Sequence, residues 1–141
     1  YERVVLSGGP LGIMAAAMDV VVPYVHEREQ FGKPIGTFQA LQHRLSDMLI
    51  EMEQARSIVI GASGYLEADT KQRDRYVSAA KNLMGRAGRM VAEDAIQMHG
   101  GIAMTWEYAA GHYSKRLVMI DHLFGDCDHH MEQIIKMGRA A

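Results

Sequence analysis

Residues 38–66 read FQALQHRLSDMLIEMEQARSIVIGASGYL, and apolar side chains recur in this stretch every three or four positions. The recurring side chains are Phe38, Leu41, Leu45, Met48, Met52, Ala55, Val59, Ala62 and Leu66. Such spacing places them on one face of a helix, whereas a strand would alternate every second residue. The stretch therefore predicts an amphipathic helix of about eight turns.

Four further helices are predicted on either side of this stretch. A second stripe with the same period predicts a long helix between the polar break at 69–72 and Gly100-Gly101, and its members are Tyr76, Ala80, Leu83, Ala87, Met90 and Ala95. Residues 2–26 are rich in Leu, Met, Ala and Val, although each helical glycine there costs about 1 kcal/mol. Pro23 should kink this helix or mark its last turns. Residues 107–119 and 128–137 predict two shorter helices, the second with Asp126 or Asp128 as N-cap.

These helices predict an all-α protein. Only Val20-Val21-Val22 could be read as a buried strand, and no longer alternating stretch supports a sheet. Three long helices with polar connections and a shorter fourth describe an antiparallel four-helix-type bundle, with a short additional C-terminal helix packed at one end.

Composition narrows the class of protein. The 141 residues fit one domain, and the 48% of hydrophobic residues exclude disorder. The formal net charge is −2 with Lys and Arg scattered, so we expect no nucleic-acid partner. The single cysteine, Cys127, cannot form an internal disulfide, which fits a reducing compartment such as the cytoplasm.

The first apolar run is interpreted as neither a membrane span nor a signal peptide, because Asp19 and Pro23 interrupt it. We therefore expect no membrane partner. The chain opens on Tyr1-Glu2-Arg3 without an initiator methionine, and we expect it to be a piece of a larger protein.

Two short segments carry residue types that suit ligand binding. Residues 28–36, REQFGKPIG, followed by Phe38-Gln39, combine a cation, an aromatic ring, glycines and an amide, although a plain helix-helix turn would also use them. Residues 97–101, QMHGG, place two glycine amides after a helix, where they could receive an anion or simply cap the helix.

Together, these segments resemble the acyl-CoA dehydrogenase family. Residues 2–48, from ERVVLSGGPLG to LSDM, are similar to the opening of the family's C-terminal helical domain, closest to the isovaleryl-CoA dehydrogenase branch. Residues 93–108, EDAIQMHGGIAMTWEY, resemble the second signature of the family, around its QxxGG element. The resemblance implies a homo-oligomeric enzyme (dimer or tetramer), with an N-terminal helical domain and a β-domain preceding residues 1–141.

The resemblance also implies FAD as cofactor. Arg28 and Gln39 match residues that contact the pyrophosphate and adenosine portions of FAD, and Phe31 packs nearby. Gln97, Met98, His99, Gly100 and Gly101 match a segment that holds the same cofactor, although His99 could instead only cap a helix. Cys127 is also expected at the cofactor. The expected electron acceptor is an electron-transfer flavoprotein.

The family's reaction removes the α-proton of an acyl-CoA thioester while the β-hydrogen leaves as hydride. Many members take their base from a motif RDAxxxxxYEGT, but here Leu117 replaces its Asp and Gly125 its Glu. Other branches carry the base on the first helix, which identifies Glu2 as the expected base. Tyr1, Arg3 and Gly125 are then expected beside the substrate, and Gly125 would leave room for the Glu2 carboxylate.

Other interpretations of these residues and of the whole protein also fit the sequence. Glu2 could only favour the helix dipole, and Asp126 is the rival base. The acid- and histidine-rich stretch 121–130 could be a metal cluster, but a polar loop with an N-cap explains it equally, and we expect no metal. The whole protein could instead be a non-catalytic partner subunit of a two-component acyl-CoA dehydrogenase. A bacterial protein would be cytoplasmic, and a eukaryotic one would lie in the mitochondrial matrix.

Overall fold

The chain folds into helices joined by short connections, in a computed structural model that describes the backbone of residues 2–139 and the side chains of residues 8–139. The helices are α1 (Glu2–Glu27), α2 (Gln39–Gly64), α3 (Thr70–His99), α4 (Ala109–Asp121) and α5 (Cys127–Arg139). Two 3-10 turns, η1 (Ile35–Thr37) and η2 (Gly100–Met104), precede α2 and follow α3. The predicted all-α class is confirmed.

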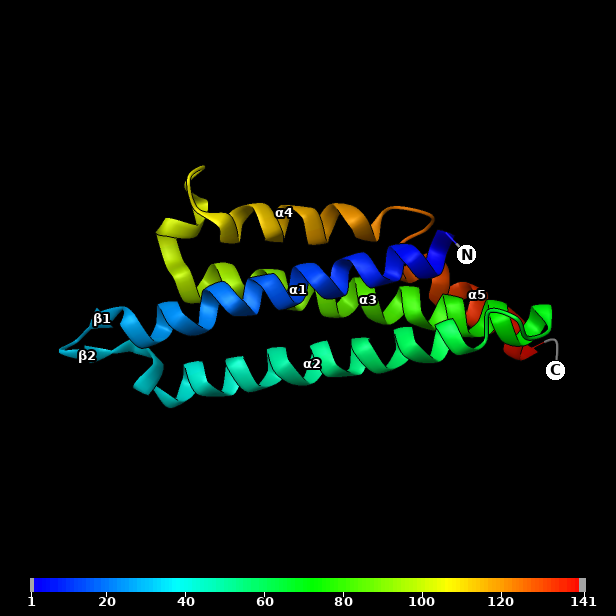
Figure 1. Ribbon diagram of the computed structural model, residues 1–141, viewed down its shortest axis with the longest axis horizontal. Coiled ribbons are helices and arrows are strands. Elements are labelled where there is room, and N and C mark those ends of the chain that lie inside the picture. The colour runs from blue at the N-terminus through cyan, green and yellow to red at the C-terminus, as the bar shows by residue number, and fades with distance from the viewer. Residues whose placement is uncertain (1, 140–141) are drawn as a thin grey trace.

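The helices form an up-down-up-down bundle. Helices α1 to α4 lie alongside one another with alternating direction, and α5 packs against α3 at one end (Figure 1). The end formed by α1, α2 and the start of α4 carries a small hairpin of β1 (Glu29–Gln30) and β2 (Lys33–Pro34). We call this the hairpin end, and the end that holds α5 the α5 end.

Small and flexible side chains build the core around α3, which contacts all four other helices. Alanines let the helix backbones approach closely, and methionines fill the irregular spaces between them. The buried side chains of this core are Met14, Ala17, Val21, Val25, Met48, Met52, Ala55, Met84, Ala87, Val91, Ala92, Ala95, Met98 and Leu117. Most of the predicted stripe on α2 therefore faces inward.

Local chemistry sets the helix ends. The Asp69 carboxylate accepts hydrogen bonds from the amides of Lys71 and Gln72, at 3.0 and 3.1 Å, and so begins α3. Gly100 ends α3 with a φ of +67°, a conformation that glycine adopts without strain. Pro23 lies within α1 without ending it. Pro23 is in the last two turns of α1, which agrees with the prediction that it marks the last turns of this helix.

Helix α1 is unusually apolar. Its stretch Gly8–Glu27 is long and apolar enough, by length and composition, to cross a membrane. A core helix meets the same criterion. Met14, Val21 and Val25 of this stretch are fully buried against the other helices. Their packing in the core explains why these positions are apolar.

Candidate functional site

At the hairpin end, a tight turn follows α1. Phe31 and Gly32 both have positive φ values, +57° and +78°, as the two-residue turn of a type I′ hairpin requires. The Phe31 side chain is 90% exposed and meets the ring of Phe38 edge-on, with 6.1 Å between ring centroids. Phe31 is thus a large apolar side chain that the left-handed turn presents to solvent.

The hairpin is anchored to the bundle through its backbone. The Arg28 amide donates to the Tyr24 carbonyl, and the Ile35 amide donates to the Arg28 carbonyl, both at 2.8 Å. A Cβ at Gly36 would lie 2.9 Å from the Val25 carbonyl oxygen, so only glycine fits there. The side chains of Arg28 and Gln39 are exposed at this end and are free to meet a ligand.

The QMHGG segment lies beside the hairpin, because the end of α3 meets the end of α1. The Tyr24 hydroxyl donates a hydrogen bond to the His99 carbonyl oxygen at 3.1 Å. Gln97 is exposed, and a Cβ added at Gly100 or Gly101 would meet nothing within 4 Å. The structure thus brings the two predicted cofactor-binding segments to one end of the bundle.

Two residues of that segment point inward instead. Met98 is buried in the core. The His99 ring lies between Tyr24 and Tyr108, with centroids 4.5 and 5.1 Å away, and its Nδ1 is 2.7 Å from the Ala95 carbonyl oxygen. Burial, then the neighbouring Tyr24 and Glu27, raise the pKa of the Tyr108 hydroxyl. Any contact of Met98 or His99 with a cofactor would therefore come from the backbone.

At the α5 end, the connection between α4 and α5 carries Gly125, Asp126 and Cys127. Gly125 has a φ of +94°, and a Cβ built there would lie 2.5 Å from Cδ2 of His129. The Asp126 carboxylate accepts a hydrogen bond from the His129 amide at 2.8 Å and caps α5. This bond lowers the pKa of Asp126, and the nearby His122 and His129 add to the shift. The connection is therefore locally constrained.

Cys127 is the one predicted cofactor residue that lies apart from the others. It begins α5, at the opposite end of the bundle from Arg28 and Gly100 (Figure 1). Burial and then the carboxylates of Asp121, Asp128 and Asp126 raise the pKa of its thiol, which keeps the sulfur protonated. The structure groups Cys127 with Gly125 and with the N-terminal end of α1.

For the expected base Glu2 and the expected substrate residue Arg3, the structure describes the backbone alone. Helix α1 begins at Glu2, at the α5 end, but the side chains of Glu2 and Arg3 lie outside the described residues, and so does Tyr1. A cavity at this end, lined in part by Pro10, Ile120 and Asp121, confirms that the first turns of α1 adjoin the end of α4.

A buried polar cluster at the α5 end was missed from the sequence. Lys81 of α3 is 4% exposed, and its Nζ donates to the Asp121 carbonyl at 3.3 Å. Burial lowers the pKa of Lys81, while Asp121, Asp126 and Cys127 oppose that shift. A lysine in a helix is normally expected to be exposed. The sequence signal for its burial was its place one residue after Ala80, a member of the predicted apolar stripe that is itself buried.

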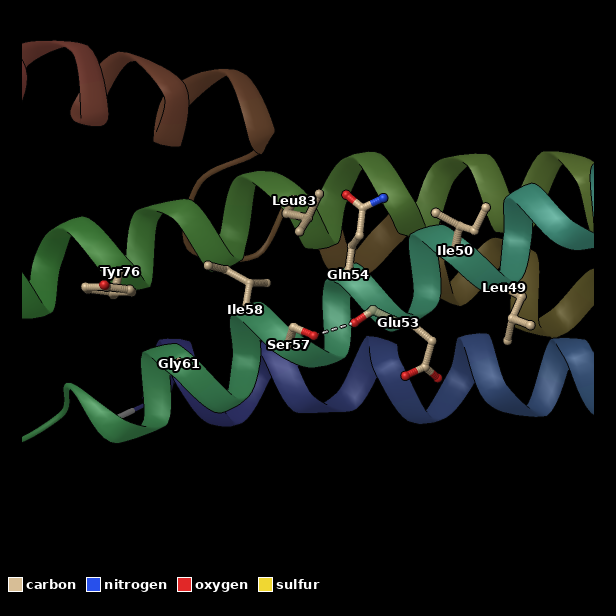
Figure 2. Close-up of a pocket in the computed structure, with 9 residues that line it drawn as sticks. All are labelled: Leu49, Ile50, Glu53, Gln54, Ser57, Ile58, Gly61, Tyr76 and Leu83. Carbon is tan, nitrogen blue, oxygen red and sulfur yellow. Dashed lines mark hydrogen bonds between the residues drawn. The ribbon is translucent and has the colours of Figure 1, made fainter.

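A further groove lies along the side of the bundle. It has a volume of about 770 Å³ and runs between α2 and α3, where Figure 2 shows apolar side chains beside Glu53, Gln54 and Ser57. The apolar side chains along it are Leu49, Ile50, Ile58, Tyr76 and Leu83. None of the predicted site residues lines it. Among the described residues, no three His, Cys, Asp or Glu side chains are placed to hold a metal ion.

Comparison with known proteins identifies the class. The family model for the acyl-CoA dehydrogenase C-terminal domain matches residues 1–138. The chain belongs to the acyl-CoA dehydrogenase family, a family of flavoproteins, and corresponds to its C-terminal helical domain. The resemblance inferred from the two sequence signatures is confirmed.

Two proteins to which the chain is similar in sequence come from plants. The chain is 42% identical over 111 residues to 2-methylacyl-CoA dehydrogenase of Solanum tuberosum and, equally, to isovaleryl-CoA dehydrogenase of Oryza sativa subsp. japonica, both mitochondrial. Each match covers 78% of this chain, but 26% and 27% of the respective relatives. The chain thus spans about a quarter of their length.

Solved structures share the fold. The steroid ACAD Tcur3481-Tcur3483 superposes with a TM-score of 0.93 at 30% identity, over 99% of this chain and 39% of that chain. An FAD complex of PigA superposes with a TM-score of 0.86 at 28% identity, over 96% of this chain and 35% of that chain.

Proposed function

We propose that the whole protein is an FAD-dependent acyl-CoA dehydrogenase acting on a short or branched-chain acyl-CoA, with Glu2 as the base that removes the α-proton. The observation that carries the proposal is the arrangement of the two ends. The hairpin end gathers Arg28, Gln39 and the open amides of Gly100 and Gly101, while the α5 end gathers the start of α1 and the connection at Gly125.

The residues at the hairpin end fit an anionic dinucleotide. Arg28 offers a guanidinium for a phosphate, and unobstructed glycine amides allow a close backbone approach. Phe31 offers an exposed ring, and the side-chain amides of Gln39 and Gln97 can bond to ribose or base edges. FAD, when bound, supplies the acceptor for the β-hydride. The similarity to an FAD complex of PigA supports this choice of cofactor.

The separation of the two ends supports an oligomer. Helix α1 has 26 residues and spans about 39 Å at 1.5 Å per residue. We infer that the pyrophosphate contacts of one subunit and the base of the same subunit serve different cofactor molecules. A homodimer or homotetramer, in which the hairpin end of one subunit meets the α5 end of another, satisfies both.

Glu2 is favoured as base over the nearby acid. Asp126 caps α5 through the His129 amide, and its lowered pKa makes it a weaker base. The positive φ of Gly125 and the adjacent His129 ring make a side chain at that position unfavourable, so position 125 is a poor place for a carboxylate. Glu2 begins α1, a helix that packs against α2, α3 and α4, so the bundle supports the helix from which the proposed base projects.

The test replaces Glu2 in the full-length protein. Glu2→Gln keeps size and polarity but cannot accept the α-proton, so flavin should still bind while its reduction by acyl-CoA slows by about 10²–10⁴-fold. Anaerobic stopped-flow absorbance of the flavin measures the step. Glu27→Gln, at the far end of the same helix, is the matched control and should reduce at the parent's rate.

The outcomes separate the candidates. Normal reduction in Glu2→Gln together with lost reduction in Asp126→Asn would make Asp126 the base. If neither change slows flavin reduction, neither residue is the base. If the full-length parent itself reduces no flavin with acyl-CoA, the chain belongs to a non-catalytic partner subunit of a two-component acyl-CoA dehydrogenase. The departures from the family motif at Leu117 and Gly125 are the observation that supports this second candidate.

Electron acceptor and compartment follow from the proposed function. We propose an electron-transfer flavoprotein as acceptor of the electrons from the reduced flavin. The proposed compartment is the cytoplasm in a bacterium or the mitochondrial matrix in a eukaryote, and the names of the plant relatives describe those proteins as mitochondrial. Reduction of that acceptor by the full-length protein with isovaleryl-CoA as donor tests the first point.

A further inference from the structure

Two consecutive residues of α3 hold the two ends of the α4–α5 connection. Lys81 Nζ donates a hydrogen bond to the carbonyl oxygen of Asp121, the last residue of α4, at 3.3 Å. Asn82 Nδ2 donates to the carbonyl oxygen of Cys127, the first residue of α5, at 2.8 Å. We call this pair of contacts the α3 clamp.

One turn further along α3, Gly85 makes the clamp possible. A Cβ built on Gly85 would overlap Oδ1 of Asp121 and would lie 3.1 Å from the Cβ of Cys127. The missing side chain therefore lets the connection settle directly on α3. Asp121 Oδ1 is buried there with no hydrogen-bond partner among the described residues, and the Asp121 carboxylate acts on the neighbouring Lys81 to raise its pKa against the effect of burial.

The connection between the clamped residues would not hold its shape unaided. Phe124 and Gly125 both have positive φ values, +60° and +94°, and Phe124 carries a side chain that is half exposed. A non-glycine residue in this conformation persists only where its surroundings fix it. The bonds to Asp121 and Cys127 fix the connection from both sides.

We propose that Lys81 and Asn82 are positioning residues that set the place of Gly125 against the acyl-CoA. The inference rests on the proposed function, because it assigns the α5 end to the substrate. Neither Lys81 nor Asn82 contacts the substrate in this proposal. Each holds the backbone of the α4–α5 connection, and Gly125 of that connection lies beside the acyl-CoA.

The test uses the full-length protein and two readouts. Asn82→Leu removes the bond to Cys127 with little change in volume, and Lys81→Met removes the bond to Asp121. Lys71→Met, on the exposed first turn of the same helix, and Gln54→Leu, exposed on α2, are the matched controls. Because Asn82 is only half-buried, Asn82→Leu should fold even if Lys81→Met does not.

Hydrogen–deuterium exchange measures the clamp itself. In Asn82→Leu, exchange of amides 122–127 should quicken by about tenfold, the effect of losing one buried hydrogen bond, while amides 97–105 should be unchanged. Steady-state kinetics with isovaleryl-CoA measure the positioning, and KM should rise by about tenfold with kcat within about twofold. Flavin content should remain that of the parent, which a general loss of folding would not allow.

The exchange and kinetic results test the clamp, the positioning role and the proposed function separately. Unchanged exchange at 122–127 overturns the clamp. Faster exchange with unchanged KM overturns the positioning role. If the parent protein oxidises no acyl-CoA while exchange still responds to Asn82→Leu, the proposed function fails and the assignment to substrate falls with it, but the clamp stands.

Discussion

The Tyr24 hydroxyl donates its hydrogen bond to the His99 carbonyl across 75 positions of sequence and 3.1 Å of space. The rings of the same two residues also contact each other, tilted by 35° with centroids 4.5 Å apart. Because Arg28 follows α1 and Gly100 follows α3, this contact fixes the two proposed cofactor-binding segments relative to each other. A change at Tyr24 should therefore disturb both stability and cofactor binding.

Tyr24→Phe is predicted to keep the ring contact and lose only the hydrogen bond. The free energy of unfolding should fall by about 0.5–1.5 kcal/mol, the usual net contribution of one such bond. Urea denaturation of the full-length protein, followed by circular dichroism, measures it. Tyr113→Phe is the control, since Tyr113 packs against the core and its hydroxyl makes no hydrogen bond to any of the described residues. An equal loss in both variants would contradict the prediction.

Arg28→Ala is predicted to weaken FAD binding in the full-length protein. A guanidinium bonded to a phosphate contributes roughly 1.5–3 kcal/mol, so flavin should be lost during gel filtration. The ratio of flavin to protein absorbance gives the result. Arg86→Ala, exposed on α3, removes the same charge elsewhere and should leave flavin content unchanged. Equal flavin retention in both variants would return Arg28 to a simple turn residue.

Gly85→Ala and Gly88→Ala are predicted to have opposite effects, although they lie one turn apart on α3. At Gly85 the new methyl group would overlap the Asp121 carboxylate, and such overpacking costs about 1–3 kcal/mol. At Gly88 it would meet Leu117 at an ordinary distance of 3.6 Å, so the better helix propensity of alanine should stabilise by about 0.5–1 kcal/mol. Thermal unfolding of the two variants should bracket the parent, and two losses of similar size would contradict the packing.

Asp126 is predicted to make the stability of α5 depend on pH. Its folded pKa is lowered, so the charged cap contributes fully above the unfolded value of about 3.9 and is lost as the pH falls through the folded pKa. Asp126→Asn can still cap the helix but does not titrate. The melting temperatures of parent and variant should therefore differ near neutral pH and converge in acid. A difference that stays constant with pH would mean that the carboxylate charge plays no part.

Long helices could be predicted from the sequence because their apolar period extends over many turns. The stretch 38–66 predicted α2 to within two residues at either end, and the acid at 126 indicated the start of α5. The hairpin at 29–34 could not be predicted, since two-residue strands carry no periodic signal. Its turn residues Phe31 and Gly32 gave only a general indication of a turn.

Tertiary relationships were harder to predict than the segments that form them. Motif similarity grouped Cys127 with Arg28 as cofactor-binding residues, but nothing in the local sequence states that a whole bundle length lies between them. Nor does it state that His99 turns its ring inward between two tyrosines. The burial of Lys81 depends on the carbonyl of Asp121, which is 40 positions away.

The close approach of Gly125 and His129 has a consequence for how a base could move between positions during evolution. A glutamate introduced at 125 would meet the imidazole of His129 and a backbone conformation that side chains avoid, so that substitution alone would damage the connection. Replacing His129 with a smaller residue would remove the collision but not the strain of the left-handed backbone at residue 125, whose φ is +94°. A carboxylate at 125 therefore needs a rearranged connection as well as a different neighbour, which favours a base supplied from another position.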